Sequence, residues 1–201
     1  NTATITITDG DISVANAILL DLDTTGVVTA TITEGGLTTL NTLTDANLNN
    51  AFTIVVTDTT LVDPADLTAV DGLTSVIVDA TAVVSLSGTA ADIDALLGDD
   101  VTLAADVDIT VTDAATIAQL TTFNAATTGT VSYTAVSGTA AALVADAGNY
   151  VTAGIDVTVT GDVTLAQIQT IDGYNAGGTL VYTGATVTGT AAVLAANAGG
   201  Y

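Results

Sequence analysis

Short runs in which apolar residues alternate with Thr recur along the whole chain. A two-residue period is typical of β-strands that turn one face toward a core. Most runs begin about 22 to 27 residues after the previous one, but the step from Val76 to Ile109 is longer and predicts an insertion near residues 101–108. The runs predict strands at residues 4–8, 30–33, 53–57, 76–80, 109–112, 131–134, 157–160 and 180–183.

Each run is followed by apolar residues three or four positions apart, which is the spacing of one face of a short helix. Leu165, Ile168 and Ile171 follow this spacing. Asp63-Pro64 has the form of a helix cap followed by proline at the first helical position. Helices of two or three turns are not stable alone, so we expect them to pack on the strands.

This alternation predicts an α/β fold in which about eight coils of strand plus short helix stack as a right-handed solenoid with one parallel β-sheet. An all-β parallel β-helix is the alternative, but a strand would scatter Leu165, Ile168 and Ile171 over both of its faces. The whole chain, 1–201, is then a single repeat array and a fragment of a longer chain. The predicted coils are 1–26, 27–51, 52–73, 74–106, 107–129, 130–154, 155–178 and 179–201.

The outward positions of the predicted strands are nearly all Thr, with an interruption at Asp79. Thr has a high β propensity and forms favourable cross-strand pairs, which explains such a column structurally. Regular Thr arrays also occur on solenoidal ice-binding proteins, so ice binding is an alternative function. The predicted surface column is Thr8, Thr33, Thr57, Thr112, Thr134, Thr160 and Thr183.

The composition excludes much chemistry, because the 201 residues include no Lys, Arg, His, Cys, Met or Trp and the net charge is −22. Nucleophilic triads, thiolate or imidazole metal sites and Schiff bases are therefore impossible. We expect no enzyme activity and no nucleic-acid partner, since phosphates are repelled by an acidic chain. An apolar fraction of 49% and a mean hydropathy of +0.64 favour a folded protein over a disordered one.

The acidic residues gather in pairs and allow two interpretations. Asp at turns and helix starts accepts backbone N–H groups and keeps the surface soluble. Alternatively, carboxylates bind calcium, which would also offset repulsion among the negative charges. The candidate calcium ligands are Asp99, Asp100, Asp106 and Asp108, and no other cofactor is expected.

The second half of the chain contains two long internal repeats. Residues 109–123 return 48 positions later as 157–171, and residues 138–150 return 51 positions later as 189–201. The strings Val136-Ser-Gly-Thr-Ala-Ala-Ala-Leu-Val-Ala-Asp-Ala-Gly and Asp156-Val-Thr-Val-Thr resemble the tandem repeats of giant bacterial cell-surface proteins. They look most like those of marine cyanobacteria, which include a very large surface protein needed for swimming without flagella.

The resemblance implies an extracellular segment at the cell surface that serves surface architecture, motility or adhesion as a stiff, protease-resistant, acidic scaffold or filament. A calcium-dependent adhesin or surface-layer repeat is a further alternative. The expected partners are other copies of the chain, through end-to-end or lateral stacking of coils, and other cell-surface components. Membrane insertion is not expected, because the uncharged stretch 125–145 is rich in Thr, Ser and Gly.

Overall fold

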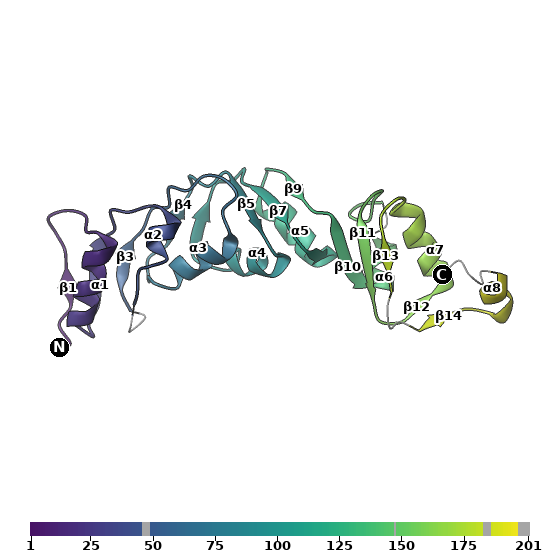
Figure 1. Cartoon of the computed structure of the whole chain (residues 1–201), viewed down its shortest axis with the longest axis horizontal. Helices are drawn as coiled ribbons and strands as arrows, with labels where there is room; N and C mark the ends of the chain where they lie inside the picture. Colours follow the sequence, from purple (N-terminus) through teal and green to yellow (C-terminus); the bar gives the residue numbers. More distant parts are fainter. Residues whose placement is uncertain (46–48, 147, 183–185, 197–201) are drawn as a thin grey trace. The chain divides into compact units, whose positions relative to one another are not determined.

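A computed structural model describes residues 1–45, 49–146, 148–182 and 186–196. Helices and short strands alternate along the chain (Figure 1), and the strand pairs are parallel. The fold is therefore α/β with parallel sheets, and the helices exclude the all-β alternative. The chain divides into two compact units: unit 1 is residues 1–110 with 125–130, and unit 2 is residues 111–124 with 131–201.

Unit 1 contains helices that each follow one or two short strands. Its helices are α1 (Val14–Asp23), α2 (Leu37–Leu40), α3 (Pro64–Asp71) and α4 (Ala90–Leu96). Its strands are β1 (Ile5–Thr6), β2 (Val28–Thr31), β3 (Ala51–Thr53), β4 (Val78–Ala80), β5 (Ser85–Gly88), β6 (Val101–Leu103) and most of β7 (Asp108–Val111).

Unit 2 also alternates short strands with single helices. Its strands are β8 (Ala114–Thr116), β9 (Val131–Ser132), β10 (Ala135–Thr139), β11 (Asp156–Thr160), β12 (Val163–Thr164), β13 (Leu180–Val181) and β14 (Val187–Thr188). Its helices are α5 (Ile117–Ala126), whose last two residues belong to unit 1, then α6 (Ala140–Ala145), α7 (Leu165–Tyr174) and α8 (Ala191–Ala196). We call each segment of strands followed by one helix a repeat.

The helix start expected at Asp63-Pro64 is confirmed, and other helices begin at similar caps. The Asp63 carboxylate accepts the Ala65 N–H before α3, with Pro64 at the first helical position. Thr89 and Thr139 cap α4 and α6 in the same way. Thr164 forms a capping box with Gln167 at α7. These side chains satisfy N–H groups that have no partner within the helix.

Strand pairing brings together residues about 23 positions apart, close to the predicted period. Val157 lies opposite Leu180, as expected. In unit 1, however, Ile5 lies opposite Val28 rather than Ala30, because the pairing is shifted by two residues from the predicted register. A two-residue shift keeps every side chain on its own face, so alternation alone cannot detect it.

The prediction of one sheet and an insertion is wrong. In unit 1, β1, β2 and β3 form one sheet and β4 and β6 form another; in unit 2, β8, β10, β11 and β13 form a sheet separate from β12 and β14. The expected insertion, residues 101–108, contains strand β6 (Val101–Leu103), which pairs in parallel with β4, and ends at the first residue of β7. The cause is that one repeat often supplies two strands, with a turn between them that redirects the chain.

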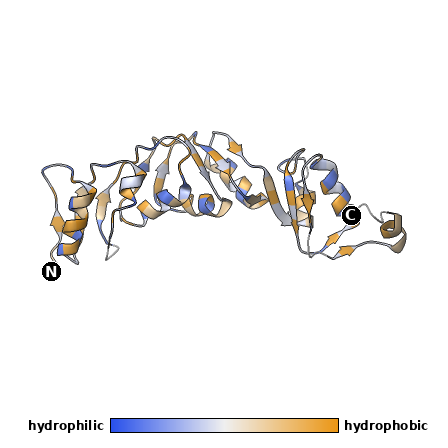
Figure 2. Cartoon of the chain, in the orientation of Figure 1, coloured by the Kyte–Doolittle hydropathy of each residue, from blue (hydrophilic) through white to orange (hydrophobic). Residues whose placement is uncertain are grey.

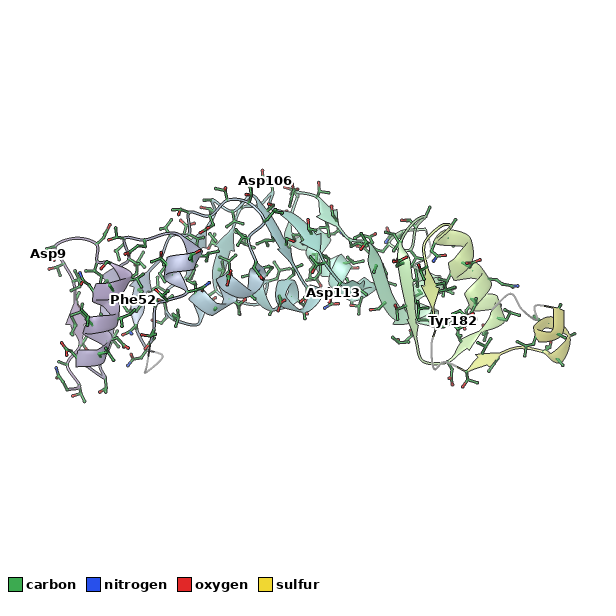
Figure 3. The ribbon with its side chains drawn as sticks, in the orientation of Figure 1. Asp9, Phe52, Asp106, Asp113 and Tyr182 are labelled. Atoms are coloured by element: carbon green, nitrogen blue, oxygen red, sulfur yellow. The ribbon has the colours of Figure 1, made fainter. Side chains whose placement is uncertain are left out.

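The core lies between strands and helices, and it combines most of the predicted helix-face residues with residues that were not predicted. Phe52 on β3, labelled in Figure 3, is fully buried. Helix residues with 0% exposure include Leu40, Leu67, Leu120, Ile168 and Ile171. Burying a side chain of this size contributes about 1.5–3 kcal/mol.

Candidate functional site

Side-chain hydrogen bonds between successive repeats recur at equivalent positions, just before a strand begins. In each case a Thr hydroxyl donates to a backbone carbonyl of the preceding repeat and accepts the N–H of the residue two positions later. The carbonyls are those of Ala3 for Thr24, Phe52 for Thr74 (2.7 Å) and Val107 for Thr127 (2.7 Å). The N–H groups belong to Gly26, Val76 and Gly129.

The next residue along the chain adds a second bridge to the preceding repeat. Its backbone N–H and its hydroxyl both donate to one carbonyl oxygen. Ser75, for example, reaches the Asn50 carbonyl with its N–H at 2.9 Å and its hydroxyl at 3.0 Å. Thr25 does the same with Asn1, and Thr128 with Ala105. We call these Thr-Thr or Thr-Ser pairs the stacking turns.

Glycine allows the backbones of neighbouring repeats to approach each other closely at two of these turns and at the equivalent place before β13. A Cβ added at Gly26, Gly129 or Gly178 would overlap backbone atoms of the preceding repeat. Each of the three lies two residues before a strand residue, respectively Val28, Val131 and Leu180. Neither the stacking turns nor these glycines were predicted; the signal in the sequence is the recurrence of Thr-Thr-Gly at 24–26 and 127–129.

Several carboxylates also join neighbouring repeats. The Asp108 and Asp156 carboxylates accept the N–H groups of Thr130 and Thr179, each at 2.7 Å. Both Asp residues open a strand, β7 and β11, and they are 48 positions apart, the period of the sequence repeat. The interpretation of Asp as an acceptor for backbone N–H groups is confirmed at these two positions.

Carboxylates of one repeat cap the helices of the preceding one. Glu34 accepts the Val14 N–H at the first residue of α1 (2.9 Å), and Asp58 accepts the Leu37 N–H at the first residue of α2 (2.7 Å). Negative charge at a helix N-terminus is favourable because of the helix dipole. α2 has no side-chain cap of its own at Gly36, so Asp58 supplies the missing acceptor.

A buried polar network joins the first repeats of unit 1. Asn50 is 0% exposed; its Oδ1 accepts the Val28 N–H (2.9 Å), and its Nδ2 donates to Asp21 Oδ1 (2.8 Å). The Asn50 N–H donates to Asp45 Oδ2 at 2.9 Å. In unit 2, Asn175 is also buried, but its Oδ1 has no hydrogen-bond partner. The sequence pattern does not predict this network, because Asn and Asp are ordinarily surface residues.

The four predicted calcium ligands occupy different places in unit 1. Asp99 and Asp100 follow α4, Asp106 is exposed on the loop between β6 and β7 (Figure 3), and Asp108 holds the Thr130 N–H. Among the described residues, no group of three or more acidic side chains is placed to hold a metal ion. The calcium hypothesis stays a prediction.

Asp99 and Asp100 instead lie near Asp71 of the preceding repeat. Partial burial, followed by the negative charge of Asp99, raises the pKa of Asp71, although an N–H of Asp100 donates to it and opposes the shift. One oxygen of Asp99, Oδ2, is buried without a hydrogen-bond partner. This crowding of carboxylates disfavours the charged form of Asp71.

Every described Thr of the predicted surface column is exposed. The strand pairing, however, does not place these Thr residues opposite one another as predicted. The exposed residues are Thr8, Thr33, Thr57, Thr112, Thr134 and Thr160; Thr183 lies outside the described residues. Thr160 lies opposite Thr139, whereas the prediction placed it beside Thr134. The register across four strands of unit 2 aligns Thr116, Ser137, Thr158 and Val181, which is a mixed row.

No family model, curated protein or solved structure matches the chain. Within the part of the chain that the structure describes, none of the helices is both long and apolar enough to cross a membrane.

Proposed function

We propose that this chain is a non-enzymatic structural segment of an extracellular cell-surface protein, and that its repeats act as a stiff, acidic, protease-resistant scaffold or filament. The observation that carries the proposal is the recurrence of the stacking turns, with the same donors and acceptors, at Thr24, Thr74 and Thr127. Equivalent joints between neighbours are the construction principle of repeat proteins whose function is length and stiffness.

We further propose that the repeats wind as a right-handed solenoid. Parallel pairing requires the chain to cross over the sheet between strands, and β-crossover-β connections are right-handed in about 98% of cases. The strand register supports regular winding, since Val28, opposite Ile5, follows it by 23 residues, and Val101, opposite Val78, also follows it by 23 residues. Small-angle scattering of the isolated chain should show the profile of a rod. A profile of two globules on a flexible link would overturn the solenoid.

The composition favours an extracellular location. Trypsin-like proteases have no Lys or Arg to cleave after, and the chain lacks Cys, Met and Trp, which oxidants attack. The sequence resemblance to giant surface proteins of marine cyanobacteria points in the same direction. The role then lies in surface architecture, motility or adhesion.

Immunogold labelling of intact cells tests the location directly. An antibody raised against the purified chain should label unpermeabilised source cells on their outer surface, while an antibody against a cytoplasmic protein labels none. Label that appears only after permeabilisation would overturn the proposal.

A further inference from the structure

Tyr is the most easily oxidised side chain that this chain contains. The sequence has five Tyr and no Cys, Met, Trp or His, so an oxidant finds no sulfur, indole or imidazole to attack. A one-electron oxidant takes an electron from the phenol ring, and the hydroxyl proton leaves with it. The phenoxyl radical that results couples to the ring of a second oxidised Tyr where one lies close.

Two of the five Tyr, Tyr133 and Tyr150, have their rings in contact within unit 2. The ring centroids are 6.3 Å apart and the ring planes are inclined by 65°, which is the edge-to-face geometry that aromatic pairs prefer. The Tyr133 hydroxyl also donates to the Tyr150 carbonyl at 3.2 Å. Among the residues that the structure describes, no other two aromatic rings are in contact.

This ring pair joins the two ends of one strand-and-helix segment. Tyr133 lies two residues before β10, β10 runs directly into α6, and Tyr150 lies in the turn after α6. All six residues of α6 are Ala, Leu or Val, and Figure 2 shows a hydrophobic helix. Both Tyr side chains are half-buried at the ends of this apolar segment. A covalent bond between the rings would therefore close a loop around β10 and α6.

Hydrogen bonds hold Tyr150 next to Tyr133. The Tyr150 hydroxyl accepts a hydrogen bond from Asn124 Nδ2 of α5 (3.3 Å), and the Tyr150 N–H donates to the Asp146 carboxylate (2.9 Å). Burial, followed by the nearby charge of Asp146, raises the pKa of Tyr133. The Tyr133 phenol therefore keeps its proton and its hydrogen bond to the Tyr150 carbonyl.

The sequence repeats both members of the pair together. The internal repeat that returns after 51 residues aligns Tyr201 with Tyr150. Strands β9 and β13 are each followed directly by a Tyr, so Tyr182 corresponds to Tyr133. Tyr182, labelled in Figure 3, is half-buried like Tyr133, whereas Tyr201 lies outside the described residues. The recurrence indicates that the pair belongs to the design of the repeat.

We propose that Tyr133 and Tyr150 form a site of oxidative cross-linking, at which a haem peroxidase with hydrogen peroxide joins the two rings as dityrosine. Each phenol gives up one electron and one proton, and the two radicals couple through a new bond between their Cε atoms. The hydrogens on those carbons move to the phenol oxygens and restore both hydroxyls. The peroxide takes up the two electrons and two protons and becomes water, so the chain loses two hydrogen atoms. The inference goes beyond the scaffold function and does not depend on it.

Peptide mapping of the oxidised chain tests the site directly. The folded full-length chain is treated with a haem peroxidase and hydrogen peroxide at low protein concentration, and the monomer is isolated. We expect dityrosine fluorescence and a mass that is lower by two hydrogen atoms for each bond formed. A protease that cleaves before Asp releases Tyr133 in peptide 113–145 and Tyr150 in peptide 146–155, so these two peptides should be recovered joined.

Phe variants identify the residues that react. Tyr133→Phe and Tyr150→Phe keep a ring at each position but have no phenol to oxidise, so each should abolish the joined product. Tyr174→Phe is the matched control, because Tyr174 is 47% exposed and packs on Gly148 near the pair, and this variant should give the product in the parent's yield. The cross-linked monomer should also have a higher thermal midpoint than the untreated chain, since the bond closes a loop in the unfolded state.

Two results would overturn the proposal. One is a folded parent chain whose oxidised monomer contains no joined 113–145 and 146–155 peptides. The other is a product in which 146–155 is joined mainly to 172–201, the peptide that contains Tyr174 and Tyr182, because Tyr150 would then couple to a different neighbour. Neither result bears on the scaffold function, which surface labelling of intact cells decides separately.

Discussion

Replacing Asn50 with Ala tests how far the buried polar network holds the first repeats together. Ala removes the acceptor of the Val28 N–H and the donor to Asp21 Oδ1, at a residue that is 0% exposed. A buried N–H without a partner costs about 1–3 kcal/mol, and a hydrogen bond to a charged group contributes about 1.5–3 kcal/mol. We therefore expect Asn50→Ala to lower the free energy of unfolding by about 3–5 kcal/mol.

Asn175→Ala is the matched control. Asn175 is also buried, but its Oδ1 has no partner and its Nδ2 makes one long bond of 3.4 Å to the Thr179 carbonyl. Its removal should cost about 1 kcal/mol in hydrogen bonding. Urea unfolding followed by circular dichroism measures both costs, and amide exchange reports the Val28 N–H, which should exchange faster in Asn50→Ala. Equal costs for the two variants, or unchanged exchange at Val28, would refute the reasoning.

Three further changes separate packing, charge and backbone proximity. Leu143→Ala should lower the unfolding free energy by about 2–5 kcal/mol, but the partly exposed Leu194→Ala by clearly less, as measured by urea unfolding. Gly178→Ala should destabilise unit 2, since its Cβ overlaps the Ile155 carbonyl, and a lowered thermal midpoint would show it. The pKa of Asp71 is raised in the fold, so its charge opposes folding above that pKa; Asp71→Asn should raise the thermal midpoint at pH 7, and the gain should vanish below the ordinary value of 3.8.

The order of strands and helices could be predicted because the sequence shows two clear periods in its apolar residues. A period of two residues indicates strands, and a spacing of three to four residues indicates helices. The Leu165, Ile168 and Ile171 spacing became helix α7, with all three residues buried. The strand register was harder to predict from the sequence. Pairing Ile5 with Val28 instead of Ala30 leaves the same side chains facing the core and the same side chains facing the solvent. Strand β6 was missed because the alternation at Val101-Thr-Leu stops after three residues, whereas the runs that predicted strands continue for four or five.

The joints between repeats were harder to predict than the repeats themselves. In the sequence, a Thr whose hydroxyl bonds to another repeat cannot be told apart from a Thr on an exposed strand face. Thr127, which is 8% exposed, and Thr160, which is exposed, differ only in what the fold brings near them. The role of a carboxylate is equally hard to read from the sequence. Asp108 was a candidate calcium ligand, and in the structure its carboxylate accepts the Thr130 N–H.

The use of carboxylates explains how an acidic chain without a single basic side chain can join its repeats. Glu34 and Asp58 each hold an N–H at the start of the preceding helix, and Asp108 and Asp156 each hold the N–H before the next strand. Backbone N–H groups thus take the part that Lys and Arg play in other proteins, and charge-assisted bonds of this kind are stronger than neutral ones. Every residue type except Pro has such an N–H, so this hydrogen bond requires an acidic residue on one side of the joint only. Together with the stacking turns and the glycines beside them, it contributes to the interface between neighbouring repeats, on which the stability of a repeat array depends.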